Sequence, residues 1–129
     1  MVTNEINVRY LTGFSGDSTY LLLSQENAIL LSDSRYTTQI EEECPGLEVV
    51  IRPHTLKMHE ATAKLIKKSK LAQIGFESSV VTVETLESWK KESNSTDFVG
   101  CASLIEDLRM IKDSEIGRAS CRERVCLAV

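Results

Sequence analysis

The sequence predicts a small α/β domain in which a mixed β-sheet is flanked by helices. Short apolar runs rich in strand-forming residues alternate along the chain with segments whose apolar residues recur at helical spacing. After one predicted hairpin, each strand is followed by a helix, which is the element order of a layered α/β domain. The chain has 129 residues, enough to bury a single core.

The predicted elements follow one another at short intervals. The first two strands, TYLLL and AILL, are separated by the polar sequence SQEN and therefore form a hairpin. Asp33 or Ser34 can provide the N-cap of the next helix, which ends at the Cys-Pro-Gly sequence. In chain order, the expected strands cover 19–23, 28–31, 47–52, 71–77 and 98–101, and the expected helices cover 36–43, 56–69, 82–92 and 104–112.

Composition excludes several classes of protein. The net charge of −4 argues against a nucleic-acid partner. The sequence contains no apolar run near the ~20 residues that a membrane span requires, and its first residues lack the apolar stretch of a signal peptide. We therefore expect a cytoplasmic protein that has no membrane partner.

The cysteines and histidines do not indicate a metal site. The four cysteines form no CxxC pair, and no histidine stands at zinc-finger spacing from them. We expect Cys44 and Cys101 to be buried thiols of a reduced, intracellular protein. The residues alone show no catalytic constellation and no metal ligands.

One polar pair stands at the junction between a strand and a helix. Arg35 and Tyr36 follow the second predicted strand, and such junctions often present polar side chains at the end of a sheet. The planar guanidinium of an arginine there could bind a carboxylate through two parallel hydrogen bonds. The alternative, an ordinary surface arginine, stays open on this evidence.

Three segments stand in order along the chain: NVRYLTGFSGDSTYLLL, LLSDSRYTTQIEEECPG and LIEDLRMIKDSEI. Together they resemble the N-terminal domain of the Xaa-Pro aminopeptidase and prolidase family, the creatinase-like "pita-bread" metallopeptidases. NVRYLTGFSGDSTYLLL resembles the family's N-x-R-Y-L-T-G-F-[ST]-G-S, with Asp17 at a frequent Ser. LLSDSRYTTQIEEECPG is similar to D-x-R-Y-x-x-Q-A, with Ile40 in place of the common Ala. LIEDLRMIKDSEI resembles the family's connection to its catalytic domain. The resemblance covers about Val2 to Ile116.

The resemblance implies a division of the chain and a non-catalytic role. Residues 1–112 would be the N-terminal domain, without the family's first helix and most of its first strand, and 113–116 would begin the linker to a catalytic domain. That domain would hold two divalent metal ions (Mn, Co or Zn), so no catalytic or metal-binding residue is expected in this chain. Without a sheet strand, the chain alone is expected to be marginally stable or to associate.

The resemblance also implies partners and site residues. In the family, the N-terminal domain helps to form a homodimer and closes over an active site, often that of the partner subunit. It implies that Arg35 contacts a proline-containing peptide substrate, and that Asp33 and Tyr36 position the loop. Two other functions stay open: a non-enzymatic interaction module like a large histone-chaperone subunit, and the N-terminal domain of a creatinase-type hydrolase.

The last residues depart from the family pattern. The apolar period is lost at Gly117, and EIGRASCRERV is similar to the in-frame translation of a sequencing-library adaptor (AGATCGGAAGAGC). We therefore expect residues 117–129 to be a non-native tail, which leaves the origin of 126–129 open. Without this segment, which holds three arginines and one glutamate, the net charge would be −6 rather than −4.

Overall fold

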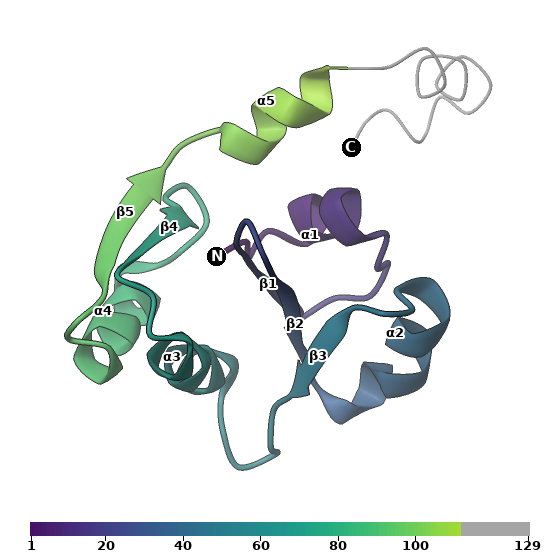
Figure 1. Cartoon of the computed structure of the whole chain (residues 1–129), viewed down its shortest axis with the longest axis horizontal. Coiled ribbons are helices and arrows are strands. Elements are labelled where there is room, and N and C mark those ends of the chain that lie inside the picture. Colours follow the sequence, from purple (N-terminus) through teal and green to yellow (C-terminus); the bar gives the residue numbers. More distant parts are fainter. Residues whose placement is uncertain (112–129) are drawn as a thin grey trace.

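Five strands form the middle layer of residues 1–111, the part of the chain that the computed structural model describes (Figure 1). Three of them make a mixed sheet in which β1 is antiparallel to β2 and β2 is parallel to β3, while β4 and β5 form a parallel pair. The strands are β1 (Tyr20–Leu23), β2 (Ala28–Ser32), β3 (Glu48–Ile51), β4 (Gln73–Glu77) and β5 (Asp97–Cys101).

Residues 1–3 join the two groups of strands. Val2 forms an antiparallel bridge with Leu21, with N–O distances of 2.8 and 2.9 Å between their backbones. The amino group of Met1 donates to the carbonyl oxygen of Gly75 in β4 at 2.7 Å. Thr3 lies close to the end of β4, because its N–H reaches Glu77. The layer is therefore a mixed one flanked by helices, and the expected fold class is confirmed.

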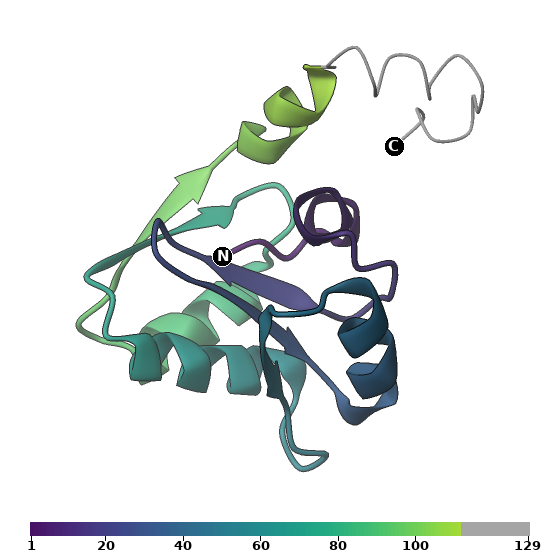
Figure 2. The same ribbon diagram turned by 45° about the vertical axis from the view of Figure 1, so that its right-hand side comes forward.

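The helices cover both faces of the strands, and Figure 2 shows α3 and α4 together on one side with α1 and α2 on the other. The last helix, α5, extends beyond the end of β5. A short 3₁₀ helix, η1, precedes α2. Their bounds are α1 (Glu5–Thr12), η1 (Ser34–Tyr36), α2 (Thr37–Glu43), α3 (Met58–Ser69), α4 (Val83–Glu92) and α5 (Leu104–Met110).

The structure confirms each predicted element within a few residues and adds α1, which the sequence analysis missed. The signals for α1 stand at its two ends. The side chain of Asn4 accepts a hydrogen bond from the N–H of Ile6, which is an N-cap. At the other end, Gly13 has a φ of 81°, and its N–H donates to the carbonyl of Arg9. A left-handed glycine of this kind ends many helices.

Successive side chains of a strand point to opposite faces of the sheet, and this alternation divides the core into two clusters. Leu21 and Leu30 point toward α1 and α2, whereas their neighbours Leu22 and Leu31 point toward α3 and α4. Both faces of a strand that lies between two helical layers must be apolar, which explains why TYLLL and AILL are almost continuously apolar. Trp89 of α4 is fully buried in the second cluster.

Three further predictions concern the cysteines, membrane-spanning segments and the C-terminal residues. Cys44 is buried, but Cys101 is only partly buried, because it lies on β5 at the edge of the layer, so that part of the cysteine prediction was wrong. Within residues 1–111, the helices are too short or too polar to cross a bilayer. Lys112, the linker expected at 113–116 and the tail expected at 117–129 lie outside the described residues.

Candidate functional site

Asp33, Arg35 and Tyr36 lie in the turn that leads from β2 into α2. Asp33 has an extended backbone, and its Oδ1 accepts a hydrogen bond from the N–H of Arg35 at 3.0 Å, so it caps η1. The helical turn that starts there reverses the chain and brings Arg35 and Tyr36 to the surface beyond the end of β2. A strand followed by a capped turn therefore positions all three residues.

Arg35 is held by Asp33 through a two-pronged ion pair. Arg35 Nε lies 3.0 Å from Asp33 Oδ1, and Nη2 lies 2.8 Å from Oδ2. The side chain of Asp33 is 6% exposed and that of Arg35 is 63% exposed, so a buried carboxylate orients an exposed guanidinium. The same guanidinium lies 5.2 Å from the centroid of the Tyr36 ring.

The ion pair shifts the pKa values of both groups. The hydrogen bond from Arg35 lowers the pKa of the Asp33 carboxyl, and the same hydrogen bond, followed by the attraction of the carboxylate charge, raises the pKa of the Arg35 guanidinium. A second arginine adds to this field, since Arg52 Nη2 lies 3.8 Å from Asp33 Oδ2. The site therefore pairs an exposed positive charge with a buried negative one.

The loop from Gly13 to Asp17 packs against this turn. The Tyr36 hydroxyl donates a hydrogen bond to the Asp17 carboxylate, and this bond raises the pKa of Tyr36. Further along α2, Glu43 accepts from the N–H and Oγ of Ser15 at 2.8 and 2.5 Å, which lowers the pKa of Glu43. Gln39 Nε2 donates to Ser15 Oγ at 3.0 Å. Two segments that are distant in sequence thus form one surface.

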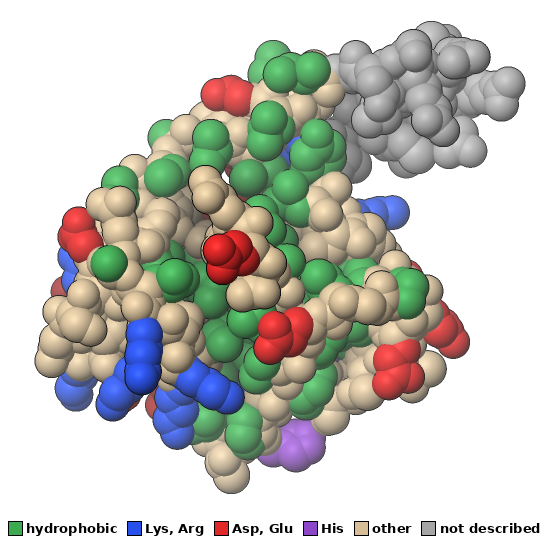
Figure 3. Space-filling model, viewed as in Figure 1, with side chains coloured by type: hydrophobic (Ala, Val, Ile, Leu, Met, Phe, Trp, Pro, Cys, Tyr) green, Lys and Arg blue, Asp and Glu red, His purple; other side chains and the backbone are tan. Residues whose placement is uncertain are grey.

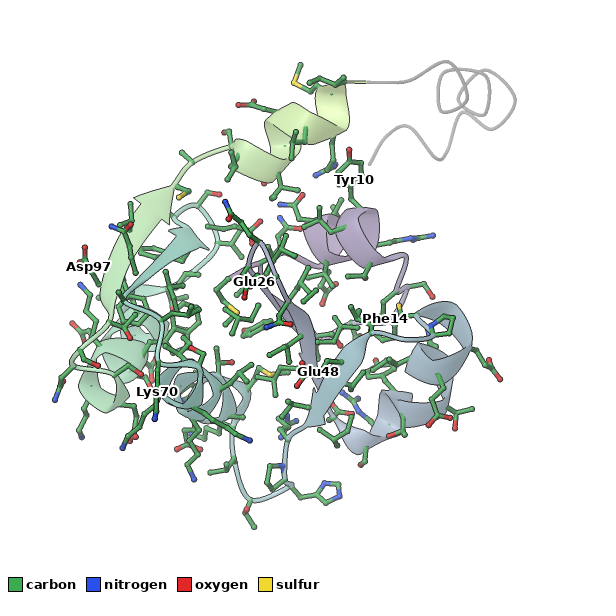
Figure 4. All side chains as sticks on the ribbon, viewed as in Figure 1. Tyr10, Phe14, Glu26, Glu48, Lys70 and Asp97 are labelled. Carbon is green, nitrogen blue, oxygen red and sulfur yellow. The ribbon has the colours of Figure 1, made fainter. Side chains whose placement is uncertain are left out.

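Phe14 and Gly16 of the loop lie beneath this surface, against the ring of Tyr36. Phe14 is fully buried, and its ring meets that of Tyr36 edge to face, with centroids 5.5 Å apart. Figure 4 shows Phe14 beside α2. Gly16 lies so close that an added Cβ would stand 2.3 Å from Phe14 Cζ and 3.0 Å from Tyr36 Cε1. Any side chain at this position would therefore force the Phe14 ring to shift.

Sequence reasoning singled out Asp33, Arg35 and Tyr36, and the structure brings these three together. It did not single out the contacts of Asp17, Ser15 and Glu43, which complete the surface. The loop and α2 belong to two different motifs of the family resemblance, and this was the one sequence feature that could have linked them. Residue spacing carries no information about a pairing between segments that lie on two different elements.

The chemistry of this surface is suited to binding. A guanidinium has five N–H donors, and within residues 1–111 that of Arg35 bonds only to Asp33, through Nε and Nη2. The remaining donors face solvent in a fixed plane, the geometry that binds a carboxylate. In the same described part of the chain, no cluster of His, Cys, Asp and Glu residues could hold a metal ion. Figure 3 shows acidic side chains toward the right of the molecule, where α2 lies.

Fold and surface together define an α/β domain with a preoriented arginine in the turn between β2 and α2. The sequence model of one family, the Creatinase/Prolidase N-terminal domain, matches residues 1–111. The chain belongs to this family.

Similar proteins agree with this membership. An uncharacterized peptidase of Bacillus subtilis, YqhT, is 31% identical over 115 residues, which are 89% of this chain and 32% of that protein. The N-terminal domain of the cytoplasmic peptidase PepQ from Mycobacterium tuberculosis superposes with a TM-score of 0.73 at 34% identity, over 83% of each chain. The Xaa-Pro dipeptidase from Bacillus anthracis superposes with a TM-score of 0.76 at 29% identity, over 88% of this chain and 31% of its own. The chain thus spans about a third of the length of the curated relative.

Proposed function

We propose that this chain is the non-catalytic N-terminal domain of a Xaa-Pro aminopeptidase or Xaa-Pro dipeptidase, in which Arg35 contacts the peptide substrate. Family membership and the dipeptidase among the similar structures support the class. The observation that carries the role of Arg35 is its ion pair with a buried carboxylate, which holds an exposed guanidinium in one orientation.

Arg35 would bind a carboxylate or a carbonyl group of a proline-containing peptide. Its unoccupied donors suit a planar, two-pronged contact, and the bond to Asp33 reduces the side-chain entropy that is lost when the peptide binds. Asp33 and Tyr36 would act as loop-positioning residues, because one fixes the guanidinium and the other joins the turn to Asp17.

Hydrolysis would take place in a domain outside this chain. We propose that this domain binds two divalent metal ions (Mn, Co or Zn), which activate water and polarise the scissile carbonyl. The N-terminal domain would contact its own catalytic domain and a partner subunit in a homodimer, and would help to close the active site. We place the parent protein in the cytoplasm, as the similar PepQ is described as a cytoplasmic peptidase.

The test is a substitution of Arg35 by Ala in a full-length parent protein. We expect kcat/KM for a Xaa-Pro peptide to fall at least about fivefold, the effect of losing about 1 kcal/mol of transition-state binding. Lys90→Ala is the control, because Lys90 is also an exposed cation but lies on α4, on the opposite side of the strands from α2.

Two outcomes would contradict the proposal in different ways. A kcat/KM that stays within about twofold in Arg35→Ala excludes a substantial substrate contact while leaving the class intact. A metal-loaded parent that hydrolyses no Xaa-Pro peptide contradicts the class itself, and points to the interaction module or to a creatinase-type hydrolase.

A further inference from the structure

A buried asparagine outside the Arg35 turn connects three elements, α1, β4 and α5. Asn7 lies on α1 and is fully buried. Its Nδ2 donates to Glu77 Oε1 at the end of β4, at 2.5 Å, and to Glu106 Oε1 on α5, at 2.9 Å. Its Oδ1 accepts from Arg109 Nη1 at 3.0 Å, also on α5. We call these four residues, Asn7, Glu77, Glu106 and Arg109, the Asn7 network.

The network is fixed to the strand layer through Glu77. This carboxylate is buried, and its Oε2 accepts from the backbone N–H groups of Thr3 at 2.7 Å and Asn4 at 2.8 Å. Glu77 therefore holds the segment that enters α1 at the same time as it holds Asn7. A buried carboxylate that accepts several hydrogen bonds has a single favourable position. Glu77 therefore holds Asn7 in a fixed place relative to the strands.

The helix at the other end of the network has little apolar contact with the domain. Ile105 is the buried residue of α5, whereas Leu104 and Met110 are 60% and 79% exposed. Figure 3 shows hydrophobic side chains on the outside of α5 at the top of the molecule. The remaining bond to α1 is polar as well, because Tyr10 donates its hydroxyl hydrogen to the carbonyl of Leu108 at 3.3 Å, and Figure 4 shows Tyr10 at α5.

We infer that Asn7 is a positioning residue that anchors α5 to the strand layer, so that a polar network rather than apolar packing sets the orientation of this helix. Glu106 and Arg109 lie three apart and therefore share one face of α5, and Asn7 binds both. This helix is the last described element, and the family match ends at residue 111, directly after it.

The chemistry of the network requires an amide at position 7. The two hydrogens of Nδ2 satisfy two carboxylates, and Oδ1 satisfies an arginine, so every polar atom of the side chain is used. An aspartate of nearly the same shape would place a third carboxyl group between the other two, which donates to neither when ionised and to only one when protonated. Asn7→Asp therefore breaks the network with a minimal change of volume.

The experiment measures hydrogen exchange of backbone amides in the full 129-residue chain. In Asn7→Asp we expect exchange of the α5 amides to accelerate at least about tenfold, while exchange in α3 changes by less than about twofold, because loss of an anchor opens one element locally. Asn27→Asp is the matched control, since it makes the same chemical change at an exposed position in the β1–β2 turn.

A second variant keeps the inference testable if the buried charge of Asn7→Asp unfolds the chain. Arg109→Ala removes the donor to Asn7 from the partly exposed side of α5 and leaves the core untouched. It should accelerate α5 exchange selectively as well. Unchanged α5 exchange in Arg109→Ala, or an equal acceleration in α5 and α3 in both variants, would overturn the anchor.

Discussion

The Asp33 carboxylate determines where Arg35 points, and it also caps the turn that carries Arg35. The cap and the ion pair differ in how much each stabilises the fold. The cap bond to the N–H of Arg35 is worth about 1 kcal/mol, as for other N-caps. The ion pair adds less than its geometry suggests, because the Arg35 side chain is largely exposed and water screens the attraction. The cap is therefore the larger contribution to stability, and the pair serves mainly for orientation.

Asp33→Asn separates the cap from the ion pair, because an asparagine can still cap the turn but cannot form the ion pair. We expect a loss of about 1 kcal/mol or less in the free energy of unfolding at neutral pH. Since Arg35 lowers the pKa of folded Asp33, the stabilisation is present above the ordinary aspartate pKa of about 3.9 and is lost as the pH falls through the lower folded value.

Chemical denaturation at neutral and at acid pH checks this prediction. The difference between the wild-type chain and Asp33→Asn should shrink as Asp33 becomes protonated. Asp97→Asn is the control, because Asp97 is exposed and, within residues 1–111, its carboxylate accepts only one long hydrogen bond, from Gln73 at 3.4 Å. A difference that persists unchanged in acid would mean that the charge of Asp33 contributes nothing.

At the scale of elements, the contact between the loop at 13–17 and α2 depends on Gly16. A methyl group there would overlap the Phe14 ring, which is buried and cannot move aside without disturbing Tyr36. We expect Gly16→Ala to lower the free energy of unfolding by about 1–3 kcal/mol, the usual range for overpacking, and thermal unfolding measures it.

A double-mutant cycle separates overpacking from other causes. Phe14→Leu removes ring atoms that the new methyl group would meet, so Gly16→Ala should cost less in that background than in the wild-type chain. An equal cost in both backgrounds would show that the close approach to Phe14 is not the reason why glycine stands there.

Elements were predictable from sequence where their pattern is local. In the hairpin, two apolar runs flank a polar turn. In α4, Thr82 caps the start of the helix, and the apolar residues of the helix, Trp89 among them, share one face. Helix α1 was missed because only Asn7 and Val8 in it are buried, so its apolar face is weak. Its end signals, Asn4 and Gly13, are clear only once the helix is known.

The same distinction applies to the candidate site. Asp33, Arg35 and Tyr36 are close in sequence, and a strand-to-helix junction predicts that they lie together. The bond between Tyr36 and Asp17 spans 19 residues, and the bond between Asn7 and Arg109 spans 102. Such pairings are set by how the layers pack, and no spacing in the sequence encodes them.

At the scale of the whole molecule, the chain carries apolar surface on more than one side. A groove of about 450 Å³ lies between α3 and the edge of the sheet, and is lined mainly by apolar side chains of β2, β3 and α3. The outer side of α5 adds Leu104 and Leu108, both exposed. Large exposed apolar patches favour association between molecules.

We therefore expect the 129-residue chain to associate reversibly as its concentration rises. Sedimentation velocity at a series of concentrations measures the association, and Tm should shift with concentration if the associated form is folded. Leu108→Ser and Val50→Lys distinguish the two surfaces, because one lies on α5 and the other lines the groove. Whichever surface is responsible, its variant should shift the equilibrium toward the monomer. A monomer at every concentration, with a reversible and concentration-independent thermal transition, would show that neither surface promotes association of the isolated domain.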